Sequence, residues 1–337
     1  MNTIKFAYLA LTISLFGLMC SACVTNIKKQ PEITKVEKNV PVFNGDSSWR
    51  YTELQTLFGP RVPNSEAHEL CRSFLVNSLS GFGAKVIEQK AGLKSFDGTI
   101  LKSTNIIASF NPEKKNRILL CAHWDSRPWS DQDPDQKNWK KPVMGANDGA
   151  SGVGVLLEIA RVIGNELKSN GNMPNTGIDI ILFDSEDIGT PAFYEGEKRE
   201  DTWCLGSQYW AKNPHIEGYK AKFGILLDMV GDPAANFGWE YFSSKYAQHV
   251  LDIVWAKAIS LGHGKYFKQV KGGAVDDDHL YINTIANIPC IDIIDYDAAS
   301  GSGFVPYWHT QGDTMENIDA NTLRAVGETL LQVVYEN

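Results

Sequence analysis

Four short apolar segments restrict the fold of this chain more than any other feature of its sequence. They span residues 117–122, 178–183, 223–227 and 288–294, without sustained alternation of polar and apolar residues. Such segments are typical of strands buried on both faces of a sheet. Stretches with a helical spacing of apolar residues lie between and after them, at about 152–163, 205–212, 244–261 and 320–335. This alternation predicts a three-layer α/β/α domain with a central mixed, largely parallel sheet.

The chain is long enough to bury a large hydrophobic core. Its 337 residues, 43% of them hydrophobic, would suffice for one large α/β domain or two ordinary ones. Because no repeat or second domain boundary is visible, we expect one folded domain over residues 46–337. Its first long helix should span about residues 64–80, where Asn64 or Ser65 can act as the N-cap and Gly81 follows the last turn.

The first residues are typical of a secretory signal peptide over residues 1–22. An apolar run over residues 6–19 is shorter than the roughly 20 residues that span a bilayer. The sequence Ser-Ala-Cys that ends at Cys23 resembles a bacterial lipoprotein processing site, so Cys23 is expected to be the acylated first residue of the mature chain. Cys20 is unusual in such a site, which leaves plain secretion as the alternative.

Residues 23–45 are predicted to be a flexible linker, because they are rich in Lys and Glu and poor in apolar residues. We therefore expect an exported lipoprotein of the bacterial cell envelope, either periplasm-facing or associated with the outer membrane. Membrane contact should occur through the lipid anchor only. The sequence does not fix the oligomeric state, and we treat the chain as a monomer.

Net charge and cysteine spacing exclude two classes of function. The formal net charge is −8, and no stretch concentrates Lys and Arg into a phosphate-binding surface, so nucleic acid is not expected as a partner. The cysteines beyond the leader form neither CxxC pairs nor a regular pattern, which argues against a thiolate zinc cluster and a disulfide framework. We expect these four to be buried small hydrophobic residues: Cys71, Cys121, Cys204 and Cys290.

Charged side chains follow the ends of three of the apolar segments, where open α/β sheets place their ligand crevice. Two more, Asp148 in a glycine-rich turn and His309 in a late loop, extend the series. The series is His123, Asp148, Glu186, Asp187, Asp228 and His309. Taken singly, each is ordinarily a helix cap, a solvated turn or a loop histidine. Converging acids repel one another unless a cation is present, and carboxylates with histidine suit a catalytic Zn²⁺.

In this order the series resembles the zinc aminopeptidase family with co-catalytic metals. It is more closely similar to the animal-type (type II) glutaminyl-peptide cyclotransferases, the glutaminyl cyclases, which share that fold and also occur in bacteria. The similarity runs from about Phe58 to the C-terminus. Besides the series it includes the segments 103–107, 121–126, 226–228, 277–279 and 308–310. The Asp-Asp-His triplet at 277–279 and the Trp308-His309 pair favour the cyclases.

The resemblance implies a zinc aminopeptidase-like fold and a specific activity, the conversion of N-terminal Gln of peptides to pyroglutamate with release of ammonia. One Zn²⁺ would be bound by Asp148, Asp187 and His309. Glu186 would be the general acid and base, and Asp228 and Asp277 would form a carboxyl network with it. Three aromatic residues would line the pocket for the substrate side chain: Trp203, Phe304 and Trp308.

Two other functions remain open at this point. An exported di-zinc aminopeptidase would use the same residues, with Asp148 bridging, Asp187 and His309 on one ion, and His123 and Asp228 on the other. A surface binding protein built on an inactive metallopeptidase domain is the third interpretation. The competent chemistry at every ligand position and at Glu186 argues against it.

The sequence departs from the animal cyclases at three positions. Asp187 stands where they have the longer Glu, so the shorter arm requires a shifted backbone. Asp276 replaces a Gln beside Asp277 and adds a negative charge. Val153 replaces a cysteine, so the disulfide of the animal enzymes cannot form.

Overall fold

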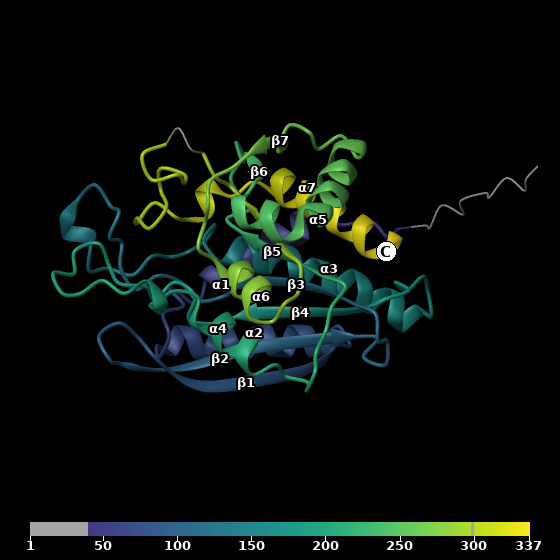
Figure 1. Cartoon of the computed structure of the whole chain (residues 1–337), viewed down its shortest axis with the longest axis horizontal. Coiled ribbons are helices and arrows are strands. Elements are labelled where there is room, and N and C mark those ends of the chain that lie inside the picture. The colour runs from purple at the N-terminus through teal and green to yellow at the C-terminus, as the bar shows by residue number, and fades with distance from the viewer. Residues whose placement is uncertain (1–39, 298–299) are drawn as a thin grey trace, which may run out of the picture. The chain divides into compact units, whose positions relative to one another are not determined.

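The computed structural model describes residues 40–297 and 300–337 (Figure 1). The predicted signal peptide, the anchor Cys23 and most of the predicted linker lie outside the described residues. Phe43, at the end of that linker, is 3% exposed, and its ring occupies the space in which Gly327 lacks a side chain. Ordered packing therefore begins before residue 46. In the described part of the chain, no helix is long and apolar enough to cross a membrane.

Among the described residues, six strands form one sheet in the order β1-β2-β4-β3-β5-β8. Their bounds are β1 (Lys85–Lys94), β2 (Ile100–Phe110), β3 (Arg117–His123), β4 (Gly177–Phe183), β5 (Phe223–Asp228) and β8 (Cys290–Ile294). The neighbouring strands β4, β3, β5 and β8 are parallel to one another. The strand β2 is antiparallel to both of its neighbours, β1 and β4. In this register Cys121 of β3 lies between Ile181 of β4 and Leu226 of β5. The sheet is thus mixed and largely parallel, as predicted.

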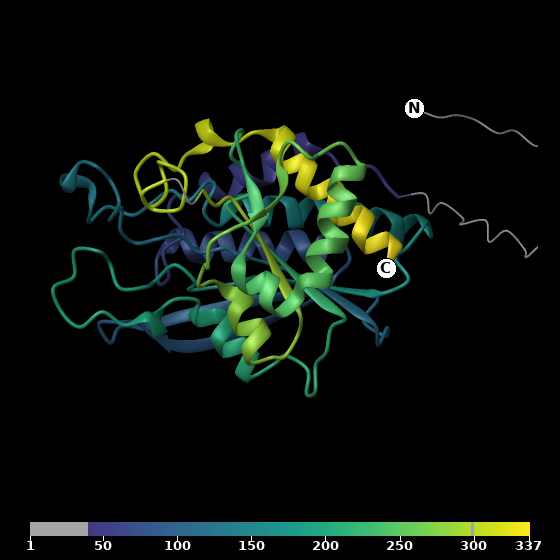
Figure 2. The same ribbon diagram turned by 45° about the horizontal axis from the view of Figure 1, so that its top comes forward.

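Helices cover both faces of this sheet and complete the three layers (Figures 1 and 2). One face carries α1 (Gly45–Thr56), α2 (Glu66–Gly81), α3 (Ala150–Ser169), α5 (Tyr241–Ser260) and α7 (Ala320–Glu336). The other carries the shorter α4 (Leu205–Lys212) and α6 (Asp278–Thr284). Successive residues of a strand point to opposite faces, so Leu120 belongs to the first core and Cys121 to the second. Figure 2 shows α5 beside α7.

The predicted elements are confirmed, with shifted ends and some omissions. The four apolar segments form β3, β4, β5 and β8, and the five helical patterns form α2, α3, α4, α5 and α7. The N-cap of α2 is Ser65, whose hydroxyl accepts a hydrogen bond from the backbone N–H of His68 at 3.1 Å. The sequence did not predict β1, β2, α6 or the two-stranded pair β6 (Phe237–Trp239) and β7 (Phe267–Lys271).

The parallel strands bring the predicted polar residues to one edge. His123 is the last residue of β3, Asp228 is the last of β5, and Glu186 follows β4 by three residues. Because β4, β3 and β5 are parallel neighbours, their carboxyl ends meet. Asp148 precedes α3, which packs on β3, and the loop after β8 carries His309 to the same edge.

The four cysteines beyond the leader are buried, as predicted, and they are free. Val153 lies on α3 and is fully buried in the core. No disulfide therefore constrains the described chain.

Candidate active site

A cavity of about 300 Å³ lies at the carboxyl edge of the sheet. Nine of the ten side chains predicted to act in catalysis, metal binding or substrate binding line it, and the tenth, His123, contacts the lining residue Asp148. The lining residues are Asp148, Glu186, Asp187, Trp203, Asp228, Met229, Ala274, Val275, Asp276, Asp277, Ile294, Phe304, Trp308 and His309. Segments that lie more than a hundred residues apart in the sequence thus converge on one cavity.

Asp148, Asp187 and His309 form the first group of possible metal ligands. The Nε2 atom of His309 lies 3.4 Å from Oδ2 of Asp148 and 3.2 Å from Oδ1 of Asp187. Two ligand atoms bound to one tetrahedral zinc at its usual bond length lie about 3.3 Å apart. The Oδ2 atom of Asp187 is buried and has no hydrogen-bond partner among the described residues. Both the spacing and this unpaired oxygen fit a bound zinc ion.

A second group of possible ligands lies beside the first and shares Asp148 with it. The Nε2 atom of His123 lies 3.0 Å from Oδ1 of Asp148 and 3.2 Å from Oδ1 of Asp228. Asp148 therefore presents one oxygen to each group, as a bridging carboxylate does. Side chains for one ion or for two are in position.

The glycine-rich turn before α3 fixes Asp148. Gly149 has a φ of +84°, and a Cβ there would lie 2.8 Å from the His123 ring and 2.9 Å from the carbonyl of Asp125. Asp313 accepts hydrogen bonds from the backbone N–H groups of Asn147 at 2.7 Å and of Asp148 at 3.1 Å. Asp313 was not predicted from the sequence, because a lone acid in a late loop carries no signal of its own.

Glu186 reaches the cavity from a tight turn after β4, in which Ser185 has a φ of +59°. Asp125 holds this turn by accepting hydrogen bonds from the backbone N–H groups of Glu186 at 3.1 Å and Asp187 at 3.2 Å. Burial raises the pKa of Glu186 well above its usual range; the His123 imidazole opposes this shift, and nearby carboxylates reinforce it. A carboxyl group with a raised pKa can accept and return a proton near neutral pH.

Asp277 lies beside this carboxyl group at the start of α6. Burial and the negative charge of Asp228 raise the pKa of Asp277 to about 7. Three atoms lie within 4.8 Å of one another: a carboxylate oxygen of Glu186, a carboxylate oxygen of Asp277 and the sulfur of Cys204. The three acids that the resemblance joined in one network, Glu186, Asp228 and Asp277, therefore line the same cavity.

The aromatic residues form a wall on the side of His309. The Trp308 ring stacks on the His309 ring with centroids 3.6 Å apart, and Phe304 lies 4.6 Å from Trp308. Trp203 lies parallel to His309 at 6.1 Å and fills the space in which Gly189 lacks a side chain. This packing makes the three rings part of a fixed wall.

Arg127 and Asp131 support the site, and neither was predicted from the sequence. Both guanidinium nitrogens Nε and Nη2 of Arg127 donate to Asp131 at 2.7 Å. Its Nη1 atom donates to Oδ1 of Asp187 at 3.2 Å, and its carbon Cζ lies 4.6 Å from the Trp203 ring centroid. Asp131 also faces Nδ1 of His309 at 3.7 Å. The sequence feature that could have pointed to Arg127 is its position directly after segment 121–126, which is part of the resemblance to the cyclases.

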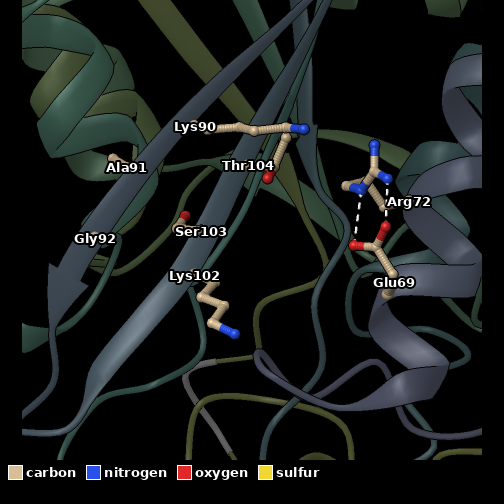
Figure 3. Close-up of a pocket in the computed structure, with 8 residues that line it drawn as sticks. All are labelled: Glu69, Arg72, Lys90, Ala91, Gly92, Lys102, Ser103 and Thr104. Atoms are coloured by element: carbon tan, nitrogen blue, oxygen red, sulfur yellow. Dashed lines mark hydrogen bonds and ion pairs between the residues drawn. The ribbon is translucent and has the colours of Figure 1, made fainter.

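A second cavity, of about 440 Å³, lies between α2 and the strands β1 and β2 (Figure 3). Its Arg72 side chain is paired with Glu69 through a hydrogen bond of 2.9 Å, and Lys90 and Lys102 are exposed. None of its eight lining residues is a histidine, cysteine or aspartate. It lacks a group of metal ligands, so we assign no chemistry to it.

Comparisons with known proteins agree with this geometry. Residues 105–334 match the model of peptidase family M28. Glutaminyl cyclase from Tannerella forsythia is 55% identical, with a TM-score of 0.85 over 88% of this chain and 100% of that chain. A Zn-dependent exopeptidase from Parabacteroides distasonis is 53% identical, with the same TM-score and coverage. The glutaminyl-peptide cyclotransferase of Bos taurus is 25% identical over 91% of this chain and 87% of its own length.

These similarities confirm the predicted resemblance and the zinc aminopeptidase-like fold class. They also support zinc as the metal, through the family and the exopeptidase. The distant similarity to the animal enzyme covers 91% of this chain, so it begins before Phe58, where the sequence had placed its start.

Proposed function

Because this chain belongs to peptidase family M28, we propose that it is a zinc-dependent glutaminyl-peptide cyclotransferase. It would convert the N-terminal Gln of peptides or proteins to pyroglutamate and release ammonia. The observation that carries this proposal is the cavity in which Asp148, Asp187 and His309 lie beside Glu186 and an aromatic wall. The glutaminyl cyclases among its relatives support the same activity.

In this proposal Asp148, Asp187 and His309 hold one zinc ion. Bound there, zinc would act as a Lewis acid on the γ-carboxamide carbonyl of the substrate. Arg127 holds Asp187 in place, which offsets the short reach of an aspartate at a position where the animal cyclases have Glu. Asp131 supports His309 on the side away from the cavity.

Glu186 would carry out the proton transfers. The α-amine nitrogen of the substrate attacks the γ-carboxamide carbon, and Glu186 accepts the proton that this nitrogen loses. The bond from this carbon to the amide nitrogen then breaks, and Glu186 returns the proton to the nitrogen that leaves as ammonia. Asp228 and Asp277 would form the carboxyl network behind Glu186. No water enters the balance, which separates this reaction from hydrolysis.

Trp203, Phe304 and Trp308 would bind the glutamine side chain. Cyclisation requires this chain to fold back so that its carboxamide carbon meets its own α-amine. A narrow pocket with rigid walls favours such a conformer and keeps water from the reacting carbon. The stacking of Trp308 on His309 brings this wall next to the proposed metal ligands.

A di-zinc aminopeptidase is the second candidate, and the group formed by His123, Asp148 and Asp228 favours it. There Glu186 would activate water against the first peptide bond. The zinc exopeptidase from Parabacteroides distasonis is consistent with this alternative. The third interpretation, an inactive binding protein, has no such support, because the candidate base and every candidate ligand converge.

The decisive experiment incubates the purified protein with a peptide that begins with Gln and records its mass. A cyclase lowers the mass by that of one ammonia molecule and leaves the chain intact. Release of a free amino acid would instead establish the aminopeptidase. The same peptide with N-terminal Ala controls for hydrolysis, because it offers a peptide bond but no carboxamide to cyclise.

We also propose that residues 46–337 form the catalytic domain of an exported monomer with a lipid anchor at Cys23. Residues 1–22 would be its signal peptide, and the linker predicted over residues 23–45 would end before Phe43, which packs against the domain. This proposal rests on the sequence alone. Mass spectrometry of the N-terminal peptide from membranes tests it, because an acylated Cys23 is expected and an unmodified secreted chain would contradict it.

A further inference from the structure

The side chain of Glu186 receives a hydrogen bond from Cys204. The Sγ atom lies 3.2 Å from Oε1 of Glu186, and Cys204 is fully buried. Across residues 40–297 and 300–337, no other side chain donates a hydrogen bond to this carboxyl group; His123 Nδ1 approaches Oε2 only to 3.8 Å. Among the described residues, the thiol of Cys204 is therefore the side-chain hydrogen-bond donor to Glu186, the proposed acid and base.

Backbone hydrogen bonds fix the thiol at this place. The N–H of Cys204 donates to the carbonyl of Glu186 at 2.8 Å, and that of Leu205 donates to the carbonyl of Ser185 at 3.0 Å. Cys204 and Ser185 have φ values of +53° and +59°, a region that costs free energy for residues with a side chain. Since α4 begins at Leu205, this corner joins the helix to the turn that carries Glu186.

The protonation state of the thiol suits a permanent hydrogen-bond donor. Burial raises the pKa of Cys204 well above its usual range, and the charge of Glu186 reinforces the shift. The thiol therefore stays protonated and is neither a nucleophile nor a metal ligand under ordinary conditions. A cysteine that served only as a small hydrophobic residue would not require its sulfur to lie within hydrogen-bond distance of a carboxylate oxygen.

We propose that Cys204 is a positioning residue, whose thiol holds Oε1 of Glu186 and leaves Oε2 directed to the substrate cavity. This inference rests on the proposed function, in which Glu186 transfers protons. Without the thiol, the carboxyl group could rotate toward Asp277, whose Oδ2 is buried without a hydrogen-bond partner among the described residues. The distance from Glu186 to the reacting nitrogen would then vary, while the metal ligands would be unaffected.

The kinetic test compares Cys204→Ala and Cys204→Ser with the wild type and with Cys290→Ala. Cys290 is another fully buried cysteine, on β8, and controls for the loss of a core thiol. A hydrogen bond to a charged group accounts for a change of about tenfold to a hundredfold, so the alanine variant should lose that much kcat with little change in KM. Cys204→Ser keeps a donor and should recover most of this loss. Zinc content should stay equal in all variants.

Equal kcat values for the alanine and serine variants, whether both normal or both reduced, would overturn the proposal. The first result would make the contact irrelevant, and the second would assign Cys204 to packing. A rise in KM alone, or a loss of zinc, would also contradict it, because the residue would then act on binding or on the metal ligands.

A measurement independent of turnover separates this inference from the proposed function. The infrared spectrum of the wild type minus that of Cys204→Ser isolates the S–H stretch of Cys204. We expect a band displaced to lower frequency than that of a free thiol, and we expect Glu186→Gln to move it. A band at the position of an unbonded thiol would overturn the inference. A wild type without cyclase activity would refute the proposed function, and the infrared band would still decide the contact.

Discussion

The Nη1 atom of Arg127 lies 3.2 Å from Oδ1 of Asp187, one of the candidate metal ligands. The same guanidinium pairs with Asp131, which faces His309, and lies over Trp203 in the cavity wall. One buried cation thus connects two proposed metal ligands to the proposed substrate pocket. Its contact with Asp187 holds this carboxyl group in its place beside His309.

Glu186→Gln should retain zinc and lose activity by about a hundredfold to ten-thousandfold, because the amide keeps the geometry but cannot transfer the proton. Ammonia release from a Gln-initiated peptide measures the loss, and elemental analysis measures the metal. Glu195→Gln, at an exposed position of the loop after β4, is the matched control and should leave kcat unchanged. Activity near wild type in Glu186→Gln would refute the assignment of the base.

Chelation followed by stepwise addition of zinc should restore activity at one ion per chain if the chain is a cyclase. His309→Ala should then bind zinc poorly, since it removes a ligand of the proposed site, whereas His123→Ala should bind it normally. Elemental analysis after dialysis checks both variants. Recovery only at two ions per chain, with zinc loss in His123→Ala, would favour the aminopeptidase.

Arg127→Met should weaken zinc binding about tenfold to a hundredfold, because it removes a support of Asp187. It should also lower the free energy of unfolding by about 3–5 kcal/mol, since Asp131 is left buried without its partner. Arg127→Met combined with Asp131→Leu removes that unpaired charge, so it should regain stability without regaining zinc affinity. Competition with a chromophoric chelator and urea unfolding measure the two quantities. Unchanged zinc affinity in the single variant would contradict the supporting role.

Asp295 should make the wild-type protein less stable as the pH rises from about 4 to about 6. Burial raises the pKa of Asp295 to about 6 in the folded protein, above its value in the unfolded chain. The folded state therefore binds more protons between about pH 4 and pH 6, so stability falls across this window and then levels off. At pH 8 the free energy of unfolding of Asp295→Asn should be about 1–3 kcal/mol higher than that of the wild type. At pH 4 the variant should be no more stable than the wild type.

Urea unfolding at the two pH values tests this expectation. The control is Asp252→Asn, because Asp252 lies on an exposed position of α5. A difference between Asp295→Asn and the wild type that does not change from pH 4 to pH 8 would show that Asp295 titrates normally.

The sequence predicted the parts of the fold that repeat a simple physical pattern. Strands such as β3 and β4 are apolar on both sides, so their burial is visible in the residues themselves. The strand β2 contains Ser103, Thr104 and Asn105, and was missed because the partners of these residues are distant in sequence. The Asn105 side chain accepts from the backbone of Asp184 and donates to that of Gly206. Such pairs exist only once the chain is folded.

In the candidate site, too, some residues could be predicted from a local pattern and others depend on contacts between distant segments. His123 and Asp228 could be predicted because they end buried strands, where open α/β sheets bind ligands. Arg127 and Cys204 could not, because an arginine after a strand is usually solvated and a lone cysteine is usually a small core residue. Their roles depend on contacts with Asp187 and Glu186 that no local pattern encodes.

The two oxygens of Asp148 point to two neighbouring sets of side chains. If the two candidate functions differ in metal count as proposed, retention of a second cation near His123 and Asp228 would favour cutting a chain over closing a ring. Small substitutions behind those two residues could shift that retention without touching the first set.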